Sequence, residues 1–223
     1  MNELDIIFGR PLQLAAGAHK DAHGRYCPMN LICVLLGEPT TGYPSCTARP
    51  LARMVQVLTD SKAGADGVLP PGRPSWAMFN LALNTVGTTD LPGPATATWM
   101  AELLTAPWGA TAWAGSGEHT EVAAEVAADL LRGAGGGGSP QHRRAQLRSK
   151  AEKAAWSGRD PVVFAVADAA VYASYSDPIM VAGRLTQAAA ARLGAPGAEQ
   201  FFQHALQRWQ SLALAMRKDQ EMR

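Results

Sequence analysis

The chain has 223 residues, of which 47% are hydrophobic and 17% charged, and its formal net charge is +1. These values exclude an intrinsically disordered protein, and they exclude strong attraction of nucleic acid by the molecular surface as a whole. No apolar run approaches the roughly 18 residues of a membrane-spanning helix, so no membrane segment is expected.

Alanine is abundant, and apolar residues in the longer segments recur every three or four positions, which favours helix over strand. We therefore predict an all-α protein. Its N-terminal region, residues 1–132, would be mainly helical with short helices, and it would include an irregular segment, residues 1–47, that is rich in glycine, proline, histidine and cysteine. A glycine-rich linker or loop, residues 133–140, would lead to a C-terminal helical bundle, residues 141–223.

In the N-terminal half, a short helix is predicted over residues 28–36, and Gly37 after its end is a typical helix stop. A second helix is predicted from Pro50 to residue 62, and a third is predicted to be capped by Ser75. The apolar residues of this third helix, Trp76, Phe79, Leu83 and Val86, would lie on one side of it.

Residues 87–97 are predicted to form a loop, residues 99–104 a short helix and residues 121–131 an amphipathic helix, whereas residues 108–117 show no clear period. Asp-Pro pairs at 160–161 and 177–178 each combine an N-cap residue with a first-turn proline, so two helices are predicted to start there. A last helix is predicted from Ala198 to about Arg217, followed by a frayed polar tail.

The N-terminus has acidic residues where a secretory signal would be basic, so a cytoplasmic protein is predicted, in which cysteines indicate thiol or metal chemistry. His19, Cys27 and Cys46 lie in the least regular part of the chain and are residue types that bind zinc. The fourth ligand would be His23, Glu38 or a water. A structural zinc site is therefore predicted, although the spacing lacks the paired C-x2-C pattern.

The same region could instead carry a thiol-dependent enzyme. Cys27 directly precedes Pro28, so a helix N-terminus would lower the pKa of its thiol, with His19 as base and Glu38 as the orienting residue or acid. A further alternative is that the thiols are buried and the histidine faces solvent. Cys33 shares the apolar face of the 28–36 helix and is expected to pack in the core.

The N-terminal third resembles a group of uncharacterised actinobacterial and actinophage proteins with the pattern G-x-H … C-x-M-E … G-E-x-x-S-D-H-P-x-C. Here the motif reads Gly17-Ala-His19, Cys27-x-Met29 and Gly37-Glu38-Pro39-x4-Pro44-x-Cys46, and Val86-Gly87-Thr88 is similar as well. The resemblance implies a phage-related protein and assigns no activity. Asn30 replaces the Glu of the pattern, and Thr41-Gly42-Tyr43 replaces its Ser-Asp-His.

A second candidate site is the basic segment 141–159, in which six basic residues and one acidic residue give a net charge of +5. A glycine arm leading into a basic helix could contact nucleic-acid phosphates. The residues that would make these contacts are Arg143, Arg144, Arg148, Lys150 and Lys153. Alternatively, the segment is a solvated helix face whose charges balance the acidic stretch 118–129.

The sequence contains no phosphate-binding loop, no H-E-x-x-H motif and no G-x-S-x-G elbow. Its six tryptophans are expected to fill gaps in an alanine-rich core, although Trp108 and Trp113 could line a ligand pocket. We predict a binding or interaction protein of unknown partner, compatible with a homo-oligomer and carrying a zinc-stabilised N-terminal segment. A thiol-dependent enzyme and a nucleic-acid-binding protein are the alternatives.

Overall fold

The computed structural model describes residues 11–17, 25–137, 141–157 and 159–222. Its regular structure is helical, which confirms the predicted all-α class. The chain forms two compact units, Met1–Asp90 and Leu91–Arg223. This division differs from the predicted one, because the described part of the glycine-rich segment lies inside the second unit, between two helices that pack on each other. Residues 138–140 of that segment lie outside the described residues.

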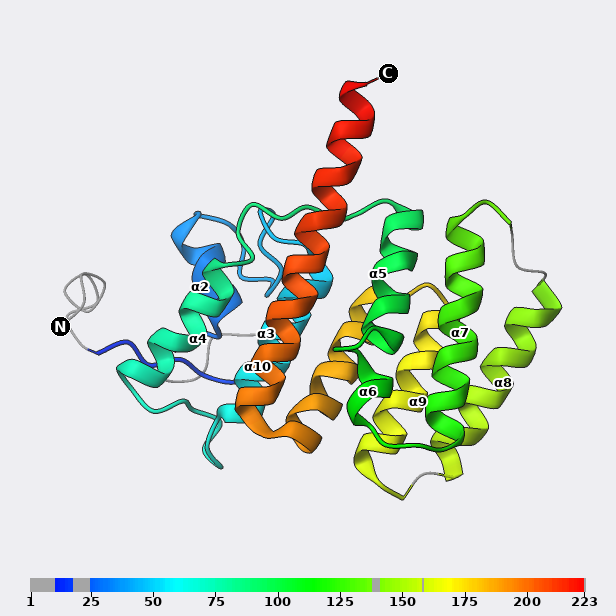
Figure 1. Cartoon of the computed structure of the whole chain (residues 1–223). Helices are drawn as coiled ribbons and strands as arrows, with labels where there is room; N and C mark the ends of the chain where they lie inside the picture. The colour runs from blue at the N-terminus through cyan, green and yellow to red at the C-terminus, as the bar shows by residue number, and fades with distance from the viewer. Residues whose placement is uncertain (1–10, 18–24, 138–140, 158, 223) are drawn as a thin grey trace. The chain divides into compact units, whose positions relative to one another are not determined.

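The described residues of the first unit form three helices, each of which packs on the other two (Figure 1). They are α2 (Pro28–Leu35), α3 (Arg49–Lys62) and α4 (Arg73–Leu83). The extended segment 11–17 runs antiparallel to residues 67–72, since Leu69 N donates to Leu14 O at 2.9 Å and Gly72 N donates to Leu12 O at 2.8 Å. The buried side chains of this segment therefore join the core of the first unit.

Helices α2 and α3 lie where the sequence predicts them, whereas α4 differs in its start and in its end. It begins after Gly72, and the Ser75 hydroxyl accepts a hydrogen bond from Leu14 N and donates one to Pro70 O instead of capping the helix. Leu83 is exposed at the end of α4, and Val86 is exposed beyond it. The prediction that Ser75 caps the helix is wrong, and the helix ends before Val86, which is predicted to share its apolar side.

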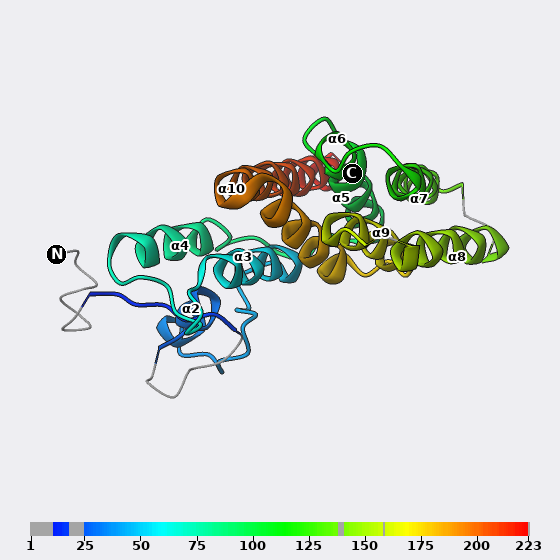
Figure 2. The same cartoon turned by 90° about the horizontal axis from the view of Figure 1, so that it is seen from below.

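The second unit is a bundle in which α9 packs on α7, α8 and α10, and α5 packs on α7 and α10. Figure 1 shows α5 and α7 side by side, and Figure 2 views the same bundle turned by 90°. Its helices are α5 (Gly93–Thr105), α6 (Ala110–Trp113), α7 (Glu118–Ala134), α8 (Gln141–Ser157), α9 (Pro161–Ser174) and α10 (Pro178–Glu221). Helix α5 begins within the predicted 87–97 loop, because Pro94 fits the first helical turn.

Both predicted Asp-Pro helix starts are confirmed. The Asp160 carboxylate accepts a hydrogen bond from Val162 N at 2.7 Å, and the Asp177 carboxylate accepts one from Met180 N at 3.0 Å. Helix α10 joins the helix that starts at Pro178 to the predicted last helix, with a break at Gly194, whose φ is 69° and ψ is −179°. The helix continues to Glu221, so the predicted end at Arg217 is wrong.

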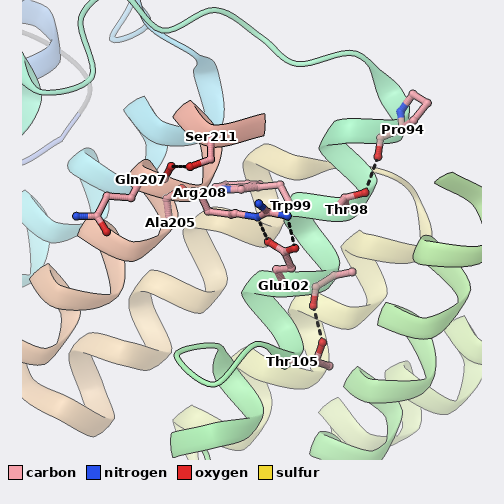
Figure 3. A network of polar contacts seen from close by, with 10 residues as sticks. Pro94, Thr98, Trp99, Glu102, Thr105, Ala205, Gln207, Arg208 and Ser211 are labelled. Atoms are coloured by element: carbon pink, nitrogen blue, oxygen red, sulfur yellow. Dashed lines mark hydrogen bonds and ion pairs between the residues drawn. The ribbon is translucent and has the colours of Figure 1, made fainter. Parts of the chain in front are cut away.

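The part of α10 after this break is fixed to α5 by one buried tryptophan and one ion pair (Figure 3). Trp99 Nε1 donates to Ala205 O at 2.9 Å, and its ring meets that of Trp209 edge to face, with centroids 4.8 Å apart. The guanidinium of Arg208 binds both carboxylate oxygens of Glu102. No helix in the described residues combines the length and the apolar character needed to cross a lipid bilayer.

The stretch that the sequence leaves unassigned contains α6 and packs onto α10 through its tryptophans. Trp108 stacks on His204 with centroids 5.8 Å apart, and Trp113 meets Phe201 edge to face at 5.8 Å. Trp99 and Trp209 are buried. These four tryptophans pack between elements of the second unit, as expected for an alanine-rich core.

Candidate functional site

The thiol of Cys27 does not have the properties that a nucleophile needs. Cys27 is the N-cap of α2, and its Sγ accepts a hydrogen bond from Asn30 N at 3.4 Å. Its side chain is fully buried, and burial raises the pKa of the thiol to about 11, against the opposing effect of the backbone N–H groups of Asn30 and Met29. The N–H groups at the helix N-terminus do lower this pKa, but the cost of burying a thiolate is larger, so the predicted low pKa is not found.

Glu38, predicted as the orienting residue or acid, instead closes a turn at the surface. Its carboxylate accepts hydrogen bonds from the hydroxyl and the backbone N of Ser45. These two donors hold the pKa of Glu38 below its usual value, first through the hydroxyl. Glu38 and Asp90 line a hollow of about 560 Å³. Both carboxylates already accept hydrogen bonds within the first unit, Glu38 from Ser45 and Asp90 from Arg49 N.

Hydrogen bonds join two separate segments of the first unit near Cys46 and Val86-Gly87-Thr88. Gly87 N donates to Cys46 O at 2.8 Å, and Ala48 N donates to the Thr88 hydroxyl at 2.9 Å. The Asp90 carboxylate accepts from Arg49 N at 3.1 Å, at the start of α3. Through these contacts, Cys46 and residues 86–88 hold together the two segments that lie beside the N-terminus of α3.

The zinc prediction involves residues that the structure does not all describe. His19 and His23 lie outside the described residues, Cys27 is buried as an N-cap, and the Cys46 Sγ lies 3.7 Å from the Thr47 hydroxyl. Within the described residues, no three histidine, cysteine, aspartate or glutamate side chains gather where they could hold a metal ion. The zinc site stays a prediction.

The basic segment forms α8 and contacts the acidic α7. Arg143 pairs with Asp129 at 3.3 Å, and Lys150 pairs with Glu125 at 2.9 Å. Arg148 stacks on the ring of Tyr175, 4.9 Å from its centroid. Three of the five predicted phosphate contacts therefore have partners within the unit, which favours the charge-balance interpretation. Arg144 and Lys153 are exposed.

Arg144 lies at a pocket that the sequence analysis did not predict. The pocket has a volume of about 400 Å³ and lies at one end of the second unit, where α5, α8 and α10 begin and α7 and α9 end. Pockets for small molecules measure roughly 300–1,000 Å³ and are mostly apolar. The side chains that make its apolar wall are Ala97, Met100, Val126, Leu130, Leu147 and Ala173.

Two charged residues, Asp129 and Arg144, line this pocket. Asp129 is buried and its Oδ1 is bound by Arg132 at 3.0 Å and by Arg143 at 3.3 Å. Arg144, which also lines the pocket, has no carboxylate partner in the part of the chain that the structure describes. The pocket therefore combines an apolar wall with one guanidinium, that of Arg144, which pairs with no carboxylate of the described residues.

Sequence reasoning missed this pocket because its wall comes from the ends of separate helices. The available local signals were the small residues Ala97, Gly133 and Ala134, which leave space at these ends. Gly133 illustrates this, since a methyl group placed on its Cα would have no atom within 4 Å. Small residues are common throughout this alanine-rich chain, so these positions do not stand out without the fold.

Comparison with known proteins adds no assignment to this geometry. No protein family model, no curated protein and no solved structure matches the chain.

Proposed function

We propose that the protein is a binding protein and that the pocket at the end of the second unit holds a small, largely apolar molecule. The observation that carries the proposal is the pocket itself, about 400 Å³ in volume, with a wall built from four helices. A preformed apolar space of this size binds a ligand by removing its apolar surface from water.

The chemistry of the lining supports binding more than catalysis. Among the described residues that line the pocket, the ionisable ones are Asp129 and Arg144, and Asp129 is committed to two arginines. The Ser174 hydroxyl, also at the pocket, donates to Val171 O at 2.6 Å, which is a helix carbonyl. A nucleophile with an adjacent base, the arrangement that covalent catalysis needs, is not formed by these side chains.

The other candidate functions have weaker support. The thiol-dependent enzyme requires an open Cys27 with a low pKa, and this thiol is buried with a raised pKa. The nucleic-acid-binding protein requires free basic side chains on α8, and three of these have partners on neighbouring elements. A protein partner, a homo-oligomer and a phage-related role stay predictions.

The pocket is tested by filling it. The probe is N-phenyl-1-naphthylamine, a neutral apolar dye whose fluorescence rises in apolar surroundings, titrated with the full chain. The filling variant is Gly133→Leu, since Gly133 lines the pocket, lies in α7 and leaves open space at its Cβ. Saturable binding of about one dye per chain is expected for the wild type, and Gly133→Leu is expected to abolish it.

The matched control is Ala124→Leu, which adds a similar side chain to an exposed position of the same helix, outside the pocket lining. It should bind the dye like the wild type. Far-UV circular dichroism and the melting temperature confirm that each variant folds, and Ala97→Phe provides a second filling variant from α5. Absence of saturable binding by the wild type, or equal binding by both filling variants, would overturn the proposal.

A further inference from the structure

We infer that the ligand of this pocket is an amphipathic anion, with an apolar body against the helix wall and one carboxylate bound by Arg144. The inference rests on the proposed function, because it assigns a ligand class to the same pocket. It uses the composition of the lining, which is mostly apolar and contains two charged residues, Asp129 and Arg144.

The two neighbouring arginines at the start of α8 have different partners. Consecutive residues of an α-helix point about 100° apart, so Arg143 and Arg144 cannot both face the same carboxylate in the same way. Arg143 reaches Asp129, with 3.3 Å between Nε and Oδ1. Arg144 lines the pocket and is exposed to solvent.

The charge balance around the pocket favours an anion over a cation. The carboxylate that a cationic ligand could bind is Asp129, which is 7% exposed and already bound by both Arg132 and Arg143. With Arg144 included, three guanidinium groups accompany this one carboxylate, which is an excess of positive charge. A ligand carboxylate beside Arg144 would accept two N–H bonds from the planar guanidinium, which is the geometry arginine matches best.

The apolar wall determines the chemical character of the rest of the ligand, outside its carboxylate. Met100, Val126 and Leu147 are buried and present carbon or sulfur to the pocket, so hydroxyl or amide groups placed against them would lose their hydrogen bonds to water. A hydrocarbon chain or an aromatic ring has no such loss. The ligand class is therefore a monocarboxylate with a compact hydrocarbon body.

The test compares two competitors that differ in their head groups, decanoate and 1-decanol. Each is used to displace N-phenyl-1-naphthylamine from the full chain at pH 7.5, where decanoate is ionised. Decanoate is expected to displace the dye at a concentration roughly five- to ten-fold lower than 1-decanol, because only decanoate pairs with Arg144. Added salt should reduce this difference by screening the exposed charge.

Arg144→Gln is expected to weaken displacement by decanoate by roughly five-fold relative to displacement by 1-decanol, each measured against the dye affinity of the variant itself. The matched control is Lys153→Gln, which removes one positive charge from an exposed position of α8 outside the pocket lining. It should leave all three ligands unaffected. This comparison separates a specific contact from a general effect of charge.

The outcomes distinguish this inference from the proposed function. If Gly133→Leu abolishes dye binding but Arg144→Gln changes decanoate displacement by less than about two-fold, the binding pocket is supported and the assignment of an anionic ligand is overturned. Tighter binding of decylamine than of decanoate would also overturn the assignment. If the wild type binds no dye and neither competitor protects it against thermal unfolding, both the pocket function and the ligand class are overturned.

Discussion

Two effects act in opposite directions on the pKa of the Cys27 thiol. The N-terminus of α2 stabilises a thiolate, and the sequence shows this influence through Pro28. Burial opposes it, and burial depends on the elements that pack over α2, which no local pattern reveals. Desolvation is the larger effect here, so the residue is an N-cap in the core instead of a nucleophile.

The raised pKa makes the stability of the first unit sensitive to alkaline pH. An unfolded thiol ionises at its usual pKa of 9.0, whereas Cys27 keeps its proton until about pH 11 in the native state. Between these values the unfolded state binds fewer protons, so the free energy of unfolding falls as the pH rises, by about 2–3 kcal/mol in total. Below pH 9 the thiol should make no pH-dependent contribution.

The measurement is urea unfolding at several pH values from 8 to 11, with Cys27→Ser compared with the wild type. Serine can cap the helix in the same way but does not ionise in this range, so the variant should lose part of the alkaline decline. Cys46→Ser, at a half-buried thiol, serves as the control. Equal pH dependence in the wild type and Cys27→Ser would contradict the assignment.

Trp99 is expected to stabilise the second unit more than the neighbouring ion pair does. Trp99→Phe removes the bond from Nε1 to Ala205 O and part of a fully buried ring, which should lower the free energy of unfolding by about 1–3 kcal/mol. Glu102→Gln breaks a pair of partly exposed groups and should lower it by about 1 kcal/mol or less. Chemical denaturation followed by circular dichroism measures both changes.

Trp156→Phe is the control for the tryptophan substitution, because the Trp156 side chain is 89% exposed. Its effect should stay within about 0.5 kcal/mol. A larger loss of stability in Glu102→Gln than in Trp99→Phe would show that the ion pair, and not aromatic packing, fixes α10 to α5.

At the scale of helices, the starts that could be predicted are those whose cap and partner are close in sequence. Asp160 and Asp177 each bind a backbone N–H two or three residues ahead, so the Asp-Pro pairs contain the whole signal. Ser75 has the same type of side chain, but its hydroxyl binds Leu14, which is distant in sequence. A pattern confined to one helix cannot show that such a partner takes the hydroxyl away from the cap.

The break in α10 depends on a glycine. Gly194 has a φ of 69° and a ψ of −179°, a backbone conformation that is almost restricted to glycine. Gly194→Ala should therefore lower the free energy of unfolding by about 1–3 kcal/mol. In contrast, Gly133 is helical with open space at its Cβ, so Gly133→Ala should raise stability by about 0.5–1 kcal/mol.

Thermal or urea unfolding of both glycine variants measures this difference in sign. The comparison is informative because both substitutions add the same methyl group within helices of the second unit. If Gly194→Ala were neutral, the two parts of α10 would have to join through some other backbone conformation than the one described.

At the scale of the whole molecule, the sequence indicates the fold class but not the division of the chain. The helical period shows an all-α protein, whereas the glycine run predicts a boundary at 133–140 that the contacts do not support. Composition reports where a connection has few side chains, and such a connection can join two helices of one core as well as two domains. The pocket could not be predicted from the sequence, because its apolar wall forms only when four helices pack together.

Two compact units with separate cores predict two cooperative unfolding transitions for the full chain, because each unit loses its own packing when it unfolds. Leu58→Ala removes a fully buried side chain of α3 and should lower the free energy of unfolding of the first unit by about 2–5 kcal/mol. Phe202→Ala removes a fully buried side chain of α10 and should lower the free energy of unfolding of the second unit by about 3–5 kcal/mol.

Differential scanning calorimetry of the wild type and both variants assigns the transitions, and a pocket ligand provides an independent check. A ligand that binds only the folded second unit raises the transition temperature of that unit by mass action and leaves the other unchanged. Decanoate should therefore shift the transition that Phe202→Ala lowers, and not the one that Leu58→Ala lowers. A single transition that moves in both variants would mean that the two units unfold together, and the ligand effect would then have to be located by dye displacement alone.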